Sequence, residues 1–174
     1  MKKKQIFLTG QKKSGKSWVL HQLTVQYGLK LCGFQTLPYE IDGVRKGFYF
    51  HSLVKTEHWE NDVPISVQPN NHSCIPVPHT FETLGVECLK LSLKSPEKYL
   101  MMDELGKLEQ SALEFQEAAY EAIQGDKIIL GVIRKDSIPW LEKLRQQIDG
   151  TIYDLDTMDS HQVLKQIAKE LNFD

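Results

Sequence analysis

A glycine-rich segment near the start of the chain has the composition of a phosphate-binding loop. Residues 10–17 read Gly-Gln-Lys-Lys-Ser-Gly-Lys-Ser and match the pattern G-x-x-x-x-G-K-[ST] at every position. The glycines allow tight turns with positive φ, so that successive backbone N–H groups point at one anion. In this pattern the lysine reaches the β- and γ-phosphates and the last hydroxyl holds Mg²⁺. We therefore expect phosphate contacts from Gly10, Gln11, Lys12, Lys13, Ser14, Gly15, Lys16 and Ser17, with Ser17 also a ligand of Mg²⁺.

Two acidic residues end a second apolar run. Residues 99–102 read Tyr-Leu-Met-Met and precede Asp103 and Glu104. An aspartate at the tip of a strand beside a phosphate loop gives a second contact to Mg²⁺, usually through water. A glutamate directly after it can accept a proton from, or orient, an attacking water. Because strand ends also carry acids for structural reasons, the phosphate loop is what favours the catalytic interpretation.

The elements around these residues follow a strand–helix alternation. Residues 6–9 are an apolar run that predicts a buried strand, and a helical pattern follows the loop to about Tyr27, where Gly28 is placed to end it. Further strands are expected over residues 31–36, 48–53, 99–102, 127–133 and 151–154. Further helices are expected over residues 81–91, 111–123, 139–148 and 163–171. This alternation predicts a three-layer α/β/α fold with a mainly parallel sheet.

The segment between the second strand and the next helix departs from this alternation. Asp42-Gly43 is a turn signal and predicts an added antiparallel β-hairpin. Residues 54–78 contain Pro64, Pro69, Pro76 and Pro78 and show no clear period, so we expect an irregular loop that is functional or mobile. We expect one domain over residues 1–174, with this hairpin and insertion at about 33–78.

The composition argues against several classes of protein. A formal net charge of −2 gives no electrostatic reason to expect a nucleic-acid binder. No apolar run approaches the ~20 residues of a membrane-spanning helix, and no signal-peptide pattern is present. The cysteines, Cys32, Cys74 and Cys88, are odd in number and lack metal-ligand spacing, which indicates reduced thiols of a cytoplasmic protein.

Four segments in one order resemble the small nucleoside-triphosphatase family first described from thermophiles, a branch of the P-loop NTPases. They are residues 10–17, 33–36 (Gly-Phe-Gln-Thr), 43–48 (Gly-Val-Arg-Lys-Gly-Phe) and 103–109 (Asp-Glu-Leu-Gly-Lys-Leu-Glu). The resemblance covers about residues 6–134 with gaps. It implies an α/β P-loop core with an added β-hairpin, and slow Mg²⁺-dependent hydrolysis of several nucleoside triphosphates, such as ATP or GTP.

The resemblance also implies roles for individual residues. Lys16, Glu104 and Arg45 form the implied catalytic set, with Mg²⁺ at Ser17 and Asp103. Arg45 either neutralises transition-state charge or is an exposed turn residue, and Glu109 either serves the site or anchors the following helix. Nucleotide contacts are implied for Tyr99, Leu100, Met101, Met102, Asp103, Glu104, Leu105 and Gly106.

The last third of the chain departs from the family pattern. The family has an Asn-Arg pair after the last strand, whereas this chain has residues 153–159 there, which include three aspartates, so the base preference stays open. Arg134 either faces the γ-phosphate or is a cation at a strand end. Two other functions remain possible: a nucleotide or small-molecule kinase, and a nucleotide-dependent switch with residues 54–78 as its protein-binding surface. Residues 54–78 lack arginine, which argues against an arginine-rich kinase lid there.

Overall fold

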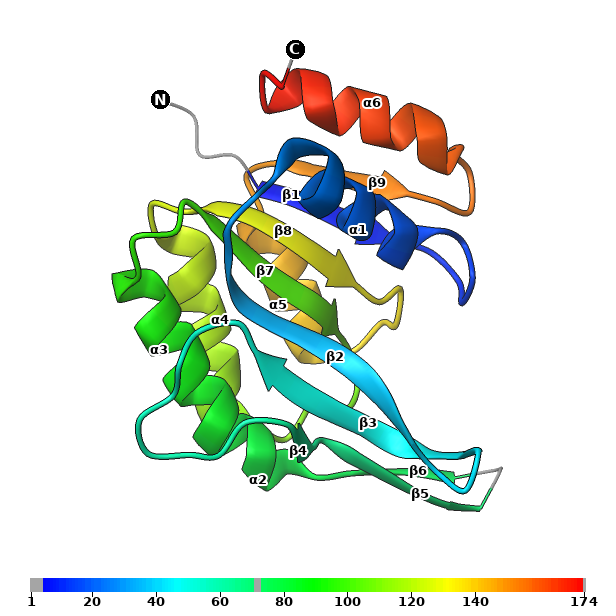
Figure 1. Ribbon diagram of the computed structural model, residues 1–174, viewed down its shortest axis with the longest axis vertical. Helices are drawn as coiled ribbons and strands as arrows, with labels where there is room; N and C mark the ends of the chain where they lie inside the picture. The colour runs from blue at the N-terminus through cyan, green and yellow to red at the C-terminus, as the bar shows by residue number, and fades with distance from the viewer. Residues whose placement is uncertain (1–4, 71–72, 174) are drawn as a thin grey trace.

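The computed structural model describes residues 5–70 and 73–173. Within these residues, the main sheet has seven strands in the order β4-β3-β2-β7-β8-β1-β9 (Figure 1). The strands are β1 (Gln5–Thr9), β2 (Leu31–Ile41), β3 (Val44–Ser52), β4 (Val63–Pro64), β7 (Tyr99–Leu105), β8 (Ile128–Ile133) and β9 (Thr151–Asp154). The pairs among β2, β7, β8, β1 and β9 are parallel, and β3 and β4 add antiparallel pairs. The predicted mainly parallel sheet is confirmed.

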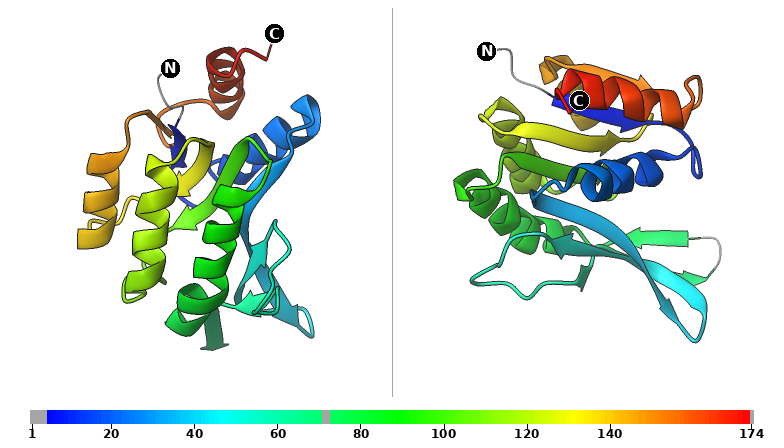
Figure 2. Two further views of the ribbon diagram at one scale, coloured as in Figure 1. Left: turned by 90° about the vertical axis from the view of Figure 1, so that its left-hand side faces the viewer. Right: turned by 45° about the horizontal axis from the view of Figure 1, so that its top comes forward.

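Helices cover both faces of the sheet (Figures 1 and 2). One face carries α1 (Lys16–Tyr27) and α6 (Ser160–Glu170), and the other carries α3 (Val86–Lys94), α4 (Leu113–Gln124) and α5 (Pro139–Gln147). The short α2 (Pro78–Thr80) and the π-helical turn η1 (Phe81–Gly85) lead into α3. Each face buries its own hydrophobic core, because side chains of a strand alternate between the two faces: Phe7 packs with α4 and α5, whereas Ile6 and Leu8 pack with α1 and α6. The predicted three-layer architecture is confirmed.

The hairpin of β2 and β3 forms at the predicted turn. Asp42 and Gly43 are the two loop residues, with φ of 51° and 74°. Two positive φ values suit the type I′ turn, whose twist matches that of paired strands. Both strands extend beyond the predicted ranges, so the hairpin projects past the carboxyl end of β7, as the cyan ribbons in Figure 1 show.

The expectation of an irregular loop over residues 54–78 is corrected in part. This segment contains β4 and a second antiparallel pair, β5 (Ser66–Asn70) and β6 (Ser73–Pro76). Its prolines are tolerated because the strands are short and lie at sheet edges, where a missing N–H need not be paired. The pair is attached to the first hairpin, since Ser66 Oγ accepts a hydrogen bond of 3.0 Å from the Phe48 N–H and Phe48 O accepts one of 2.9 Å from the Ile65 N–H.

Gly33, in the second family-like segment, lies where β2 and β7 come closest. Its φ is 94°, and a Cβ there would stand 2.0 Å from the Met101 carbonyl oxygen. We expect Gly33→Ala to lower the free energy of unfolding by more than ~2 kcal/mol, measured by urea denaturation. Gly28→Ala is the matched control, because Gly28 also has positive φ (61°) but nothing lies within 4 Å of its Cβ position. Equal losses in both variants would contradict the steric explanation.

Candidate active site

The predicted phosphate loop connects β1 to α1 at the carboxyl edge of the sheet. Lys16 turns back over it: its Nζ donates hydrogen bonds to Gly10 O (2.8 Å), Gln11 O (2.6 Å) and Ser14 Oγ (3.2 Å). Gly15, with φ of 104°, is the N-cap of α1, so the free N–H groups at the N-terminus of this helix adjoin the loop. Burial lowers the pKa of Lys16, and the nearby carboxylates of Glu104 and Asp156 oppose this shift.

Asp103 and Glu104 lie at the carboxyl end of β7. Thr36 of β2 holds the first of them, because its N–H donates to Asp103 Oδ2 (3.1 Å) and its hydroxyl donates to Asp103 O (2.9 Å). This contact gives a structural role to the threonine of the Gly-Phe-Gln-Thr segment. Burial raises the pKa of Asp103 to about 6. Glu104 has a left-handed φ of 64° at a break in the register between β7 and β8, and its side chain is 41% exposed.

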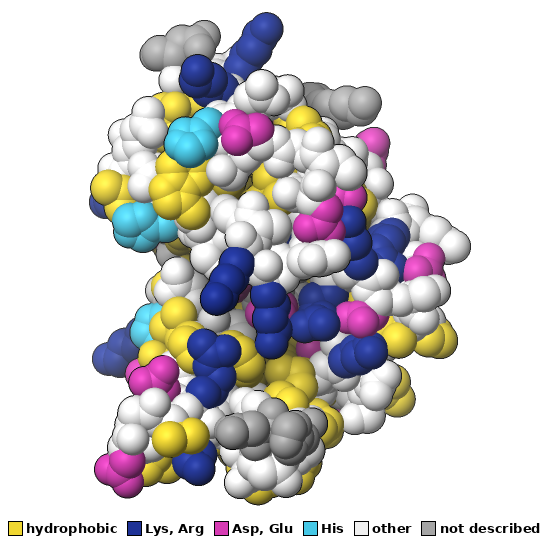
Figure 3. Space-filling model, turned by 90° about the vertical axis from the view of Figure 1, so that its right-hand side faces the viewer, with side chains coloured by type: hydrophobic (Ala, Val, Ile, Leu, Met, Phe, Trp, Pro, Cys, Tyr) yellow, Lys and Arg dark blue, Asp and Glu magenta, His cyan; other side chains and the backbone are white. Residues whose placement is uncertain are grey.

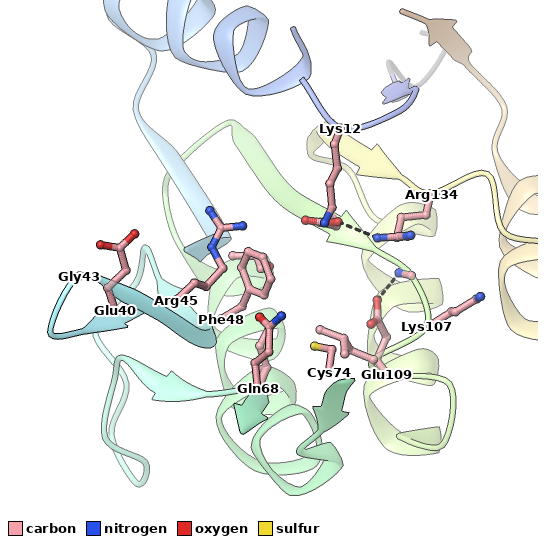
Figure 4. Close-up of a pocket in the computed structure, with 15 residues that line it drawn as sticks. Lys12, Glu40, Gly43, Arg45, Phe48, Gln68, Cys74, Lys107, Glu109 and Arg134 are labelled. Carbon is pink, nitrogen blue, oxygen red and sulfur yellow. Dashed lines mark hydrogen bonds and ion pairs between the residues drawn. The ribbon is translucent and has the colours of Figure 1, made fainter. Parts of the chain in front are cut away.

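Arg134 follows β8 and faces the acidic pair. Its Nη1 lies 3.4 Å from Glu104 Oε1, and its Nε donates to Asp136 Oδ2 at 2.8 Å. In Figure 4 a dashed line at Arg134 marks this contact, and the side chain of Lys12 extends toward it from the phosphate loop. Arg134 therefore lies beside Glu104 on the wall of a cavity next to the phosphate loop, and its contact with the γ-phosphate stays a prediction.

Two adjoining cavities open around these groups. The smaller, of about 310 Å³, is lined by Gly10, Gln11, Lys12, Lys16, Glu104, Val132, Ile133, Arg134, Lys135 and Asp136. The larger, of about 610 Å³, lies between the hairpins and the segment after β7, and it shares Lys12, Glu104 and Arg134 with the smaller one. Lys and Arg side chains gather across the middle of this face of the molecule, around a hollow with an apolar floor (Figure 3).

The nucleotide contacts implied along the whole of β7 need correction. Leu100, Met101, Met102 and Leu105 are buried in the hydrophobic cores, because this strand is covered by helices on both faces. Tyr99 lies at the opposite end of the strand, with its ring 6.1 Å from that of Phe173. The members of the predicted set that reach the cavities are Glu104 and Gly106, with Asp103 at the strand tip beside them.

Arg45 is separated from the phosphate loop by the larger cavity. It lines that cavity from β3, and its guanidinium lies 5.4 Å from the centre of the Phe48 ring, but it does not line the smaller cavity. Figure 4 shows it on the opposite side of the cavity from Arg134. Its catalytic role stays a prediction.

Glu109 closes the segment that follows β7. It is 1% exposed, and its Oε1 accepts a hydrogen bond of 2.6 Å from the Gly106 N–H. The Gly106 carbonyl in turn accepts one of 2.8 Å from the indole of Trp140 on α5. These contacts fit the anchoring alternative for Glu109. Burial raises its pKa to about 8.

The raised pKa of Glu109 predicts a pH-dependent stability. The folded chain keeps this proton up to about pH 8, whereas an unfolded chain releases it near the ordinary value of 4.5. Between these values the folded state binds more protons, so stability falls as pH rises, by at most about 1.4 kcal/mol per pH unit. Glu109→Gln retains an acceptor for Gly106 and removes the titration. We expect urea denaturation to show that the free energy of unfolding decreases less between pH 5.5 and pH 7.5 in this variant than in the wild type. Equal decreases in the two proteins would contradict the assignment.

The acidic segment after β9 contributes a contact that sequence reasoning missed. Asp156 Oδ1 accepts a hydrogen bond of 2.8 Å from the Gln11 N–H, in the phosphate loop. Lys135 Nζ lies 2.7 Å from Asp154 Oδ2 and 2.8 Å from Asp156 Oδ2. Part of the segment that we expected to affect base contacts therefore braces the loop. The aspartates alone gave no signal for this, because the partner is a backbone N–H far away in the chain.

The order of the strands and the placement of the site define a class of protein. A phosphate loop after β1 and an acidic pair at the carboxyl end of β7, with β8 between the two strands, make this molecule a P-loop NTPase. A sequence model of the NTPase family matches residues 5–168, and the chain belongs to this family. The family resemblance predicted from the sequence is confirmed.

Named relatives resemble this chain in sequence, and two solved structures resemble it in fold. Nucleoside-triphosphatase THEP1 of Thermotoga sp. (strain RQ2) is 25% identical over 171 residues, covering 97% of this chain and 96% of that protein. The same-named protein of Methanocaldococcus jannaschii is 25% identical over 174 residues, covering 96% of each. The solution structure of a human cancer-related nucleoside triphosphatase matches with a TM-score of 0.71 at 22% identity over 97% of both chains. The crystal structure of THEP1 from Aquifex aeolicus matches with a TM-score of 0.70 at 19% identity, covering 94% of this chain and 96% of that one.

Proposed function

We propose that this chain binds a nucleoside triphosphate with Mg²⁺ and hydrolyses its β–γ phosphoanhydride bond. Membership of the NTPase family supports the activity, and relatives that match nearly the whole chain are named nucleoside-triphosphatases. The single observation that carries the proposal for the site is the placement of Glu104 on the wall of the cavity that Lys16 also lines. A carboxylate and the phosphate-loop lysine thus border one space of about 310 Å³.

The residues present fit Mg²⁺ bound together with a nucleotide. Ser17, in the first turn of α1, and Asp103 offer hard oxygen donors, which Mg²⁺ prefers. The described residues contain no group of three or more His, Cys, Asp or Glu side chains that could hold a metal ion. Mg²⁺ in nucleotide sites usually takes one or two protein ligands together with phosphate oxygens and water, so a donor set of this size is appropriate. When bound, the ion would neutralise charge on the β- and γ-phosphates.

The chain's own groups have separate tasks in the proposed hydrolysis. The loop N–H groups and Lys16 bind the phosphates and stabilise the charge that develops on them. Glu104 orients the attacking water and accepts its proton. Asp156 holds the start of the loop through the Gln11 N–H, and Thr36 holds Asp103 in place. These positioning contacts reduce the reorganisation needed when the nucleotide binds.

The arginine nearer to Glu104 is expected to matter more for hydrolysis. Arg134 contacts Glu104, whereas Arg45 lies across the larger cavity. We expect Arg134→Ala to lower kcat by about 10- to 100-fold or more, as for loss of a cation at developing phosphoryl charge. Arg45→Ala should lower kcat for hydrolysis less. Steady-state phosphate release at saturating nucleotide measures both, and a larger loss in Arg45→Ala would reverse the assignment.

Phosphate release across the common nucleoside triphosphates tests the activity itself. Wild-type protein with Mg²⁺ should release phosphate from ATP or GTP, and Lys16→Ala should release it at least about 100-fold more slowly. Equal release by wild type and Lys16→Ala would indicate contamination and remove the support for the proposal. The ratio of kcat/KM values among the nucleotides would establish the base preference, which the sequence leaves open.

The cytoplasmic location expected from the sequence stays a prediction. All three cysteines are free, with Cys32 and Cys88 buried and Cys74 exposed. Among the described residues, no helix has the length and apolar character needed to cross a bilayer.

A further inference from the structure

The larger cavity exceeds what hydrolysis requires. A water molecule occupies about 30 Å³ of the liquid, whereas pockets that bind small organic molecules measure roughly 300–1,000 Å³. The cavity between the hairpins and the segment after β7 measures about 610 Å³, in addition to the cavity beside the phosphate loop. It therefore has room for a second organic molecule while the loop holds a triphosphate.

The position of this cavity places any occupant beside the reacting phosphate. Lys12, Glu104 and Arg134 line both cavities, so they stand where the two spaces meet. Lys16 lines only the smaller one, and in phosphate loops this lysine contacts the β- and γ-phosphates. A molecule in the larger cavity would thus approach the γ-phosphate from the side on which Glu104 would hold the attacking water.

The charged side chains around the cavity favour an anionic occupant. Lys12 from the phosphate loop and Arg45 from β3 line it on two sides (Figure 4). Lys107, from the segment after β7, also lines it, with its ammonium turned outward to 3.3 Å from Asp136. Of the three acids in its lining, Glu109 is neutral near pH 7 because burial raises its pKa to about 8, and Glu104 is paired with Arg134. The third, Glu40, is exposed to solvent and lies opposite Arg45 in the register of the hairpin. The cations come from elements other than residues 54–78, so the lack of arginine in that segment does not leave the cavity without positive charge.

The rest of the lining favours an occupant with a flat ring. Phe48 presents its ring beneath the Arg45 guanidinium, at 5.4 Å, an arrangement that can also stack a base. Gln68 and Thr36 add side chains that both donate and accept hydrogen bonds. Apolar contacts come from Phe48, Ile65 and Leu108.

We propose that the larger cavity binds a nucleoside monophosphate and that the enzyme transfers the γ-phosphoryl group to it. This rests on the proposed function, since it uses the same bound triphosphate. An oxygen of the acceptor phosphate forms a bond to the γ-phosphorus, the bond from the γ-phosphorus to the β–γ bridging oxygen breaks, and its electron pair stays on the departing diphosphate. The products are two nucleoside diphosphates. At pH 7 most of the acceptor phosphate is doubly ionised, because its second pKa is about 6, so no proton has to move to Glu104.

Transfer of label distinguishes this activity from hydrolysis. The full chain is incubated at pH 7 with Mg²⁺, γ-³²P-labelled ATP or GTP, and AMP, GMP, CMP or UMP in turn. We expect labelled diphosphate of at least one added monophosphate, with a matching fall in labelled inorganic phosphate. Release of inorganic phosphate alone, unchanged by every monophosphate, would overturn the inference and leave the hydrolase intact. Absence of both products would instead overturn the proposed function.

Two variants separate transfer from hydrolysis at the level of residues. Glu104→Gln should lose hydrolysis and keep transfer, because only water needs a base. Lys107→Ala, whose side chain is 61% exposed and lies 3.3 Å from Asp136, should reduce transfer at least fivefold at limiting monophosphate and leave hydrolysis without acceptor unchanged. Lys143→Ala is the matched control, a lysine of α5 at 3.7 Å from Glu117 and outside both cavities. If Lys107→Ala and Lys143→Ala change the rate of transfer equally, the acceptor binds outside the larger cavity.

Discussion

Replacing Glu104 with glutamine is expected to lower the rate of hydrolysis by about 10²- to 10⁴-fold, the usual contribution of a general base. The amide has the size of the carboxylate and retains an oxygen that can accept from Arg134, whose Nη1 lies 3.4 Å away in the wild type. It cannot take a proton from water. Nucleotide affinity should therefore change by only a few-fold, whereas kcat should decrease by the full factor given above. Calorimetric binding together with single-turnover phosphate release separates the two effects.

A second glutamate offers the matched control for this substitution. Glu142 on α5 pairs with an arginine, Arg145, at 2.7 Å, but it lines neither cavity beside the phosphate loop. Glu142→Gln thus removes a carboxylate from an arginine pair outside both cavities. Arg145 keeps its hydrogen bonds to the Arg134 and Asp136 carbonyls, so the variant should hydrolyse nucleotide at a rate close to that of the wild type. Turnover of Glu104→Gln above about a tenth of the wild-type rate would exclude Glu104 as the base, since that loss is below the range for general-base catalysis.

Replacing Lys16 with alanine is expected to lower kcat/KM by about 10²- to 10³-fold or more, because one preorganised charge at the phosphates is lost. The ammonium is held by Gly10 O, Gln11 O and Ser14 Oγ, on the inside of the loop. A methyl group has no donor to offer either the loop or a phosphate. Affinity for the triphosphate should fall together with turnover, which distinguishes this variant from Glu104→Gln.

The control for Lys16→Ala is a lysine with similar bonds far from the site. Lys127 Nζ donates to Ser95 O at 2.8 Å and to Glu97 O at 2.5 Å, at the other end of β8. Lys127→Ala should cost stability without altering kcat/KM at temperatures where the protein stays folded. If the loss of kcat/KM in each variant is proportional to the decrease in its melting temperature, Lys16 contributes only to the folding of the loop.

The parts of the site that the sequence predicted are local ones. The phosphate loop is a continuous segment, so its glycines, lysine and serine were recognisable from spacing alone. Asp103 and Glu104 were recognisable because they end an apolar run, and the turn at Asp42 because its chemistry is set by two residues.

The parts that escaped prediction depend on contacts between distant residues. Asp156 meets Gln11 across 145 positions, and Arg134 meets Glu104 across 30. Neither contact has a periodicity or a local motif to reveal it. The larger cavity joins side chains from the phosphate loop, both hairpins and the segment after β7, so it emerges only when the sheet assembles them. The sequence also failed to predict β5 and β6. Their prolines are compatible with edge strands, but proline has a low propensity for strands and so obscured the pattern.

The strand between the loop and the acidic pair makes the site tolerant of mutational drift. Leu130 of β8 is in register with Ile6 of β1 on one side and Met101 of β7 on the other. Neighbouring strands lie about 4.8 Å apart whatever their side chains, so the main chain alone sets a separation of roughly 10 Å between the strands that carry the loop and the carboxylates. Apolar residues within β8 can be exchanged for one another over evolutionary time while that separation persists. The spacing between the phosphate loop and the carboxylates is thus set by the topology of the sheet and not by the apolar side chains of β8.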